Sequence, residues 1–131
     1  MRLNFRRVIL VALTAVLMTP NAWSQVVFTD ITQEAGIGLE GWLTESVAWG
    51  DYDNDGDLDL DVVNFDAGLD VLYRNDGPVG PGGAYRFTDI TVAAGTTLER
   101  SSRGMAFVDY DRDGLLDIFV NAIGLNILYR N

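Results

Sequence analysis

Apolar and polar residues partly alternate along several short segments of this chain, and turns rich in Asp and Gly separate these segments. Residues 58–63 and 116–120 show the pattern most clearly, and each of them follows an acidic turn. Short, β-branched, partly alternating segments of this kind predict strands. The predicted strands are residues 46–52, 58–64, 69–75 and 85–91, followed by 104–110, 115–121 and 125–131. We therefore expect an all-β fold.

The strands recur in the same order at a period of about sixty residues. Phe-Thr-Asp-Ile-Thr at residues 28–32 returns at residues 87–91, and an Ala-Gly pair lies three residues beyond each copy. Leu-Tyr-Arg-Asn at residues 72–75 returns at residues 128–131. A period of this length is longer than a WD40 repeat and suits a four-stranded propeller blade with a long loop. The copy at residues 28–32 predicts an additional outer strand ahead of both blades.

An acidic nine-residue loop lies inside each repeat, at residues 51–59 and 109–117. Carboxylates stand at positions one, three, five and nine, and a Gly at position six folds the loop back. Converging carboxylates at this spacing predict a calcium ion in each loop, with the backbone carbonyl of position seven as a further ligand. The candidate ligands are Asp51, Asp53, Asp55, Asp57 and Asp59 in the first loop and Asp109, Asp111, Asp113, Leu115 and Asp117 in the second.

Other readings of the loops fit the residues less well. An EF-hand places a bidentate Glu at position twelve, where this chain has Val62 and Val120, and it has helical flanks where strands are predicted here. A dockerin-like pair would recur at about half this period. Solvated acidic turns need only one or two carboxylates, and four or five within nine residues repel one another by about 1 kcal/mol per close pair in water.

Taken together, the acidic loops, the strands after them and the repeated flanks resemble FG-GAP/VCBS-type repeats. These form the calcium-loop blades of integrin α-subunit propellers and of secreted bacterial proteins related to cartilage acidic protein. The resemblance covers residues 28–131 and implies antiparallel four-stranded blades, about two of a seven-blade-type propeller, that serve adhesion or recognition of proteins or glycans. The chain departs from the family pattern at residues 49–50 and 107–108, where Trp-Gly and Phe-Val stand for Phe-Gly, and the Gly-Ala-Pro part is absent. Asp61 also occupies the strand position that holds Phe119 in the second repeat.

The first residues have the pattern of a signal peptide. Three arginines precede an apolar run over residues 8–18, and a small-x-small cleavage pattern follows at residues 22–24. The run is about half the length that crosses a bilayer. Cleavage after Ser24 removes the three arginines, so the net charge falls from −10 to −13. We expect export to the periplasm, the cell surface or the medium, and no nucleic-acid partner.

The expected organisation has four parts: a signal peptide at 1–24, a leading outer strand and connection at 25–45, a first blade at 46–91, and a second, incomplete blade at 92–131. Two blades cannot close a ring, because repeats bury their apolar faces only against neighbours. The chain is then a fragment of a longer propeller, a unit that assembles into a ring of copies, or a short divergent product. We expect the first, because the sequence stops on a repeated Leu-Tyr-Arg-Asn.

The composition argues against catalysis by this segment. Cys, His and Lys are absent, which removes disulfides, the usual general base and the imidazole ligands of zinc. We expect a non-catalytic module; the alternative is the N-terminal scaffold of a secreted hydrolase or lyase whose catalytic part lies beyond the chain. Trp49 and Phe107, directly before the loops, should pack between blades. Residues 76–83, rich in Gly and Pro, should form a flexible surface loop.

Overall fold

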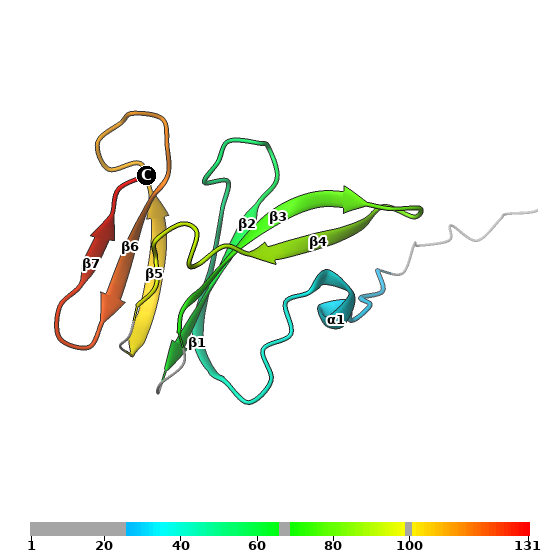
Figure 1. The fold of residues 1–131 in the computed structure, drawn as a ribbon, viewed down its shortest axis with the longest axis horizontal. Coiled ribbons are helices and arrows are strands. Elements are labelled where there is room, and N and C mark those ends of the chain that lie inside the picture. The colour runs from blue at the N-terminus through cyan, green and yellow to red at the C-terminus, as the bar shows by residue number, and fades with distance from the viewer. Residues whose placement is uncertain (1–25, 66–68, 99–100) are drawn as a thin grey trace, which may run out of the picture.

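The computed structural model of the chain describes residues 26–65, 69–98 and 101–131, so the predicted signal peptide lies outside the described residues. These residues form two antiparallel sheets that lie side by side, with one short helix near the first sheet (Figure 1). The all-β prediction is confirmed. In the described ranges, no helix is long and apolar enough to span a bilayer.

Each sheet is a meander in which every strand pairs with the next one along the chain. The first sheet contains β1 (Leu43–Gly50), β2 (Asp59–Phe65), β3 (Val71–Val79) and β4 (Ala84–Asp89). The second contains β5 (Ser102–Val108), β6 (Asp117–Ala122) and β7 (Ile127–Tyr129). All seven predicted strands are therefore present, with their ends shifted by a few residues.

The two sheets repeat the same register. Trp49 pairs with Leu60 in the first sheet, as Phe107 pairs with Ile118 in the second. Each first strand also carries an irregularity near its start, between Thr44 and Ser46 in β1 and between Ser102 and Gly104 in β5. The sequence repeat is thus a structural repeat, in which each acidic loop joins the first two strands of a sheet.

One apolar core lies between the two sheets. Its buried members are Leu72, Leu98, Ile118, Val120 and Ala122. Met105 and Phe107 of β5 pack against this cluster, so Phe107 lies between the sheets as predicted. A Cβ on Gly50 would stand 2.6 Å from the Phe107 ring, which explains why β1 has no side chain there.

A second cluster covers the opposite face of the first sheet. It consists of Leu60, Val62, Val71 and Tyr73, with Ile37, Leu39 and Phe87 packed against it. Trp49 belongs to this face, since it pairs with Leu60 and makes an edge-to-face contact with Phe87 at 6.0 Å between ring centroids. Trp49 therefore faces away from the second sheet in this structure, unlike its counterpart Phe107.

The predicted strand at residues 28–32 is not a strand. Residues 26–31 have no regular structure, and helix α1 (Thr32–Ala35) begins at the last residue of the motif. Asp30 accepts a hydrogen bond from the backbone N–H of Thr32, as Asp89 does from Thr91, both at 3.0 Å. The turn is therefore encoded locally in both copies, whereas strand pairing requires a neighbour. Residue 87 has one in β3, and the described chain gives residue 28 none.

The predicted flexible loop at residues 76–83 is largely a hairpin. Strand β3 continues to Val79, so only residues 80–83 form the turn before β4. A register shift between Asn75 and Pro78 accommodates Gly and Pro in the strand. Asp76 fastens the hairpin, because its carboxylate accepts hydrogen bonds from Arg74 and from the Thr88 hydroxyl. The β3–β4 arm extends away from the second sheet (Figure 1).

A buried carboxyl interrupts the face that the first sheet turns to the second. Asp61 is 5% exposed, and its Oδ1 has no hydrogen-bond partner among the described residues. Burial, together with the nearby Asp70 carboxylate, raises the pKa of Asp61 from 3.8 to about 7. Asp70 instead receives hydrogen bonds from the Asn64 backbone and from the Ser102 hydroxyl of β5. The Asp61 position is therefore a weak point in the packing when it is ionised.

We expect Asp61→Asn to stabilise the protein at pH 8 by roughly 1 to 4 kcal/mol, with little effect near pH 4. The folded pKa of Asp61 is raised, so the contribution of this group to wild-type stability is largest below about pH 4 and falls until the carboxyl ionises near pH 7. The neutral amide removes that loss. Denaturant melts of both proteins across pH 4 to 8, at one fixed calcium concentration, measure the difference. A constant difference across this range would contradict the prediction.

Candidate metal centres

Hydrogen bonds from backbone N–H groups to a carboxylate four or five residues earlier close each acidic loop. The Asp51 carboxylate accepts the N–H groups of Asp55 and Gly56, each at 3.1 Å. In the second loop, Asp109 accepts those of Asp113 and Gly114 at the same distances. The two loops therefore have the same internal hydrogen bonds as well as the same sequence spacing.

Two left-handed residues complete the fold-back in each loop. Position six is Gly56 with φ 95° and Gly114 with φ 92°, a conformation that glycine adopts freely. Position four is Asn54 with φ 59° in the first loop and Arg112 with φ 64° in the second. Asn tolerates this region far better than Arg does, so the second loop carries more backbone strain.

The fold-back brings three carboxylates of each loop together. One oxygen each from Asp51, Asp53 and Asp59 lies within 4.8 Å of the others. The second loop brings together Asp109, Asp111 and Asp117 in the same way. These are positions one, three and nine of the predicted ligand set. Their donor atoms are hard oxygens only, which is the chemistry that calcium and magnesium require.

The other predicted ligands have different surroundings. At position five, Asp55 and Asp113 accept the N–H of the residue two further on, at 2.9 and 3.0 Å. Neither belongs to the converging trio. The Asp57 carboxylate points toward Gly77, because its Oδ2 would stand 3.0 Å from a Cβ at that position. Leu115 offers no side-chain ligand, so a contribution from the backbone of position seven stays a prediction.

Position nine joins the loop to the third strand of its sheet. Asp59 is fully buried and accepts the backbone N–H groups of Tyr52 at 3.1 Å and Asn75 at 2.8 Å. Burial raises the pKa of Asp59, although both hydrogen bonds oppose the rise. Asp117 is equally buried and accepts from Tyr110 and Asn131. This anchoring role is additional to the ligand role that the sequence indicated.

The Asn of the repeated Leu-Tyr-Arg-Asn motif fastens the same junction. Asn75 donates its side-chain N–H to the carbonyl of Leu58 at 3.0 Å, and Asn131 donates to Leu116 at 3.2 Å. The sequence pattern predicts the motif only as part of a strand. Its exact repetition was the signal for this function, because packing alone does not require an amide at the same place twice.

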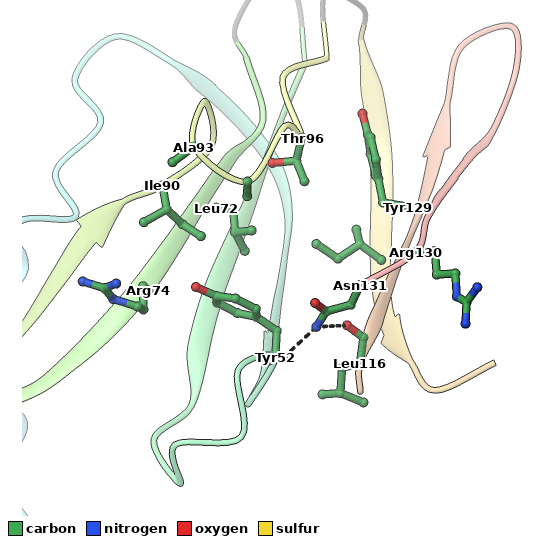
Figure 2. Close-up of a pocket in the computed structure, with 12 residues that line it drawn as sticks. Tyr52, Leu72, Arg74, Ile90, Ala93, Thr96, Leu116, Tyr129, Arg130 and Asn131 are labelled. Carbon is green, nitrogen blue, oxygen red and sulfur yellow. Dashed lines mark hydrogen bonds between the residues drawn. The ribbon is translucent and has the colours of Figure 1, made fainter. Parts of the chain in front are cut away.

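Direct contacts connect the two loops. The Asn54 side chain donates a hydrogen bond to the carbonyl of Gly114 at 3.1 Å, from one loop to the other. Asn131 also donates to the carbonyl of Tyr52 at 2.8 Å. Figure 2 shows the Asn131 amide between Tyr52 and Leu116, with one hydrogen bond to each. The two candidate metal centres therefore belong to one connected surface.

A cleft of about 440 Å³ lies beside this junction. Its lining is Tyr52, Leu72, Arg74, Ile90, Ala93, Ala94, Thr96, Leu116, Ile118, Tyr129, Arg130 and Asn131. Arg74 and Arg130 lie on opposite sides of the cleft (Figure 2), and each makes an ion pair with an Asp outside it. Among the described residues, no Asp or Glu lines the cleft, so these residues do not provide the acid pair that glycoside hydrolysis uses.

No family model, curated protein or solved structure matches this chain. The interpretation of the loops therefore depends on their own geometry and on the sequence pattern.

We expect Asp59→Ala to destabilise the protein by at least about 2 kcal/mol more than Asp53→Ala. Both variants remove one carboxylate from the first loop, but only Asp59→Ala leaves the N–H groups of Tyr52 and Asn75 without their acceptor. An unsatisfied buried N–H costs about 1 to 3 kcal/mol. Denaturant melts in one calcium-containing buffer provide the comparison. Equal losses would show that position nine acts only as a ligand.

Proposed function

We propose that this chain is an exported, non-catalytic calcium-binding module of the FG-GAP/VCBS β-propeller type, used for adhesion or for recognition of a protein or glycan. The observation that carries the proposal is the duplicated loop, in which the same three carboxylates converge with the same hydrogen bonds. Two copies of one arrangement, about sixty residues apart, are better explained by a shared ligand than by solvation.

The donor set supports calcium above other metals. Zinc prefers imidazole and thiolate ligands, and the chain has neither His nor Cys. Magnesium demands a strict octahedron, whereas calcium accepts six to eight oxygens from a flexible acidic loop. Asp51, Asp53 and Asp59 would hold the first ion, completed by Asp55, a backbone carbonyl or water. The second ion would have the equivalent ligands. Each ion would neutralise a crowded group of carboxylates.

The exposed apolar side chains on the two sheets support the proposal that further propeller blades pack against them. Phe107 packs against the first sheet, whereas its counterpart Trp49 is 51% exposed. Leu72 is buried against the second sheet, whereas its counterpart Leu128 is 47% exposed. Each type of face is thus packed against the other sheet once. Its counterpart is open on the second sheet, and on the first sheet it is open along β1 only, because Ile37, Leu39 and Phe87 pack over the rest of that face. A further blade, or a second copy, would cover both open faces with the packing already present between the sheets.

The alternative function is a scaffold that carries a hydrolase or lyase domain. The cleft beside Asn131 supplies no carboxylate, and the chain supplies no His or Lys. Such an enzyme would need catalytic residues from outside this sequence. A longer reading frame with further repeats alone would favour the recognition module, and one with a recognisable catalytic domain would favour the scaffold.

We expect two calcium ions per chain and a higher melting temperature in millimolar calcium than in chelator. Binding to the folded state alone stabilises it, even at affinities of about 10⁻⁴ to 10⁻³ M. Thermal melts give the stabilisation, and calorimetry gives the stoichiometry. A melting temperature that calcium leaves unchanged would refute the calcium proposal.

The same calorimetry on variants assigns the ions to loops. Asp51→Ala and Asp109→Ala should each remove one ion, because each deletes a member of a converging trio. Asp57→Ala is the control and should retain both ions, since its carboxylate lies outside the trio. Loss of an ion in Asp57→Ala, with two ions retained in Asp51→Ala, would show that the ligand positions are misassigned.

We also expect the purified protein to self-associate in calcium buffer, because both open sheet faces expose large apolar side chains. Trp49→Ser and Phe119→Ser, one on each open face, should shift the mass toward the monomer. Val92→Ser is the control, since Val92 is 82% exposed in a turn outside both faces. Light scattering measures the mass. A monodisperse wild-type monomer would contradict the packing proposal.

A further inference from the structure

The two candidate metal centres differ in one contact. Arg130 places its Nη2 3.0 Å from Oδ2 of Asp111 and 3.6 Å from Oδ2 of Asp113. Asp111 belongs to the converging trio of the second loop. Arg130, the residue after β7, is therefore paired with a carboxylate that would bind the metal.

Among the described residues, no arginine lies within ion-pair distance of a carboxylate of the first loop, although the negative charge of Asp53 helps to raise the pKa of Arg74. The repeat counterpart of Arg130 is Arg74, which forms its ion pair with Asp76 at 2.7 Å. Asp76 fastens the β3–β4 hairpin and is not a loop residue. The carboxylates of the first loop form no ion pair with Arg74, so the repeat places the same residue type in two different roles.

The loop sequences differ in the same direction. Residues 51–59 contain five carboxylates and no basic residue, a formal charge of −5. Residues 109–117 contain four carboxylates and Arg112, a formal charge of −3. Calcium affinity of such loops depends on the charge of the ligand set. Composition and the Arg130 contact therefore both weaken the attraction of the second loop for a cation.

We propose that the two loops are a strong and a weak calcium site, and that Arg130 acts as an internal counter-cation that lowers the affinity of the second loop. The proposal rests on the calcium-binding function proposed above. An incoming ion must share Asp111 with the guanidinium or displace it from the loop. The first loop then fills at low calcium and the second only at higher calcium, so the occupancy of the second loop follows the calcium concentration around the protein.

The test measures each loop by itself. In an Asp51→Ala background only the second loop binds, and in an Asp109→Ala background only the first. Calorimetric titration with calcium chloride should give at least about tenfold tighter binding by the first loop. Arg130→Gln should tighten the second loop about threefold to tenfold, since a unit charge near the ion is removed in an exposed setting. It should leave the first loop within about twofold.

Two variants separate charge from other effects. Arg74→Gln is the matched control, and it should leave the affinity of the second loop unchanged because Arg74 is paired with Asp76. Arg130→Lys keeps the positive charge and should keep the weak affinity. The gain in affinity from Arg130→Gln should also shrink as sodium chloride is raised from roughly 50 to 500 mM, because salt screens the interaction between exposed charges.

The outcomes distinguish this inference from the function on which it rests. Absence of calcium binding in both backgrounds would refute the calcium function itself. Binding with equal affinity in the two loops, or an Arg130→Gln effect no larger than that of Arg74→Gln, would refute the counter-cation role and leave the calcium function standing. An Arg130→Lys variant that binds as tightly as Arg130→Gln would also refute it, because the charge would then have no effect.

Discussion

The structure of each repeat depends on a buried carboxylate that accepts two backbone N–H groups. Asp59 binds the loop through Tyr52 and the third strand through Asn75, and Asp117 repeats this arrangement in the second sheet. Its burial would be costly without these hydrogen bonds. With them, the carboxylate fixes the loop against the sheet and brings the other acidic residues into a common position. The candidate metal centre is therefore a consequence of how the sheet is joined together.

The converging carboxylates repel one another, and the two loops differ in how this negative charge is compensated. In the first loop, Asp51 and Asp53 of the trio make no ion pair with Arg74, which is paired with Asp76 instead. In the second, Arg130 lies against Asp111, so part of the charge is already neutralised within the protein. Hydrogen bonds from Asn54 and Asn131 hold the two loops next to each other. Ion binding in one loop therefore changes the charge close to the other loop. We propose that this connection places two calcium sites of unequal strength on one surface.

The packing between the sheets shows how repeats of one sequence become unequal. Asp61 faces the second sheet, where burial raises its pKa to about 7. Its counterpart Phe119 is 39% exposed on the open face of the second sheet. The polar residue thus lies at the covered interface and the aromatic one at the open face, the reverse of what packing within this chain alone would favour. This distribution supports a neighbour for the second sheet, as the propeller proposal requires.

The sequence by itself determined the features that depend on a few neighbouring residues. The loop spacing and the glycine at position six act over a few residues, so they could be predicted without a fold. The Asp30-to-Thr32 turn is equally local, but the sequence pattern there was interpreted as a strand. Tertiary structure decided the rest, because pairing and burial need partners from distant segments. Only it shows that residues 28–32 have no strand neighbour in the described part of the chain, that Asp59 reaches Asn75, and that Arg130 rather than Arg74 forms an ion pair with a loop.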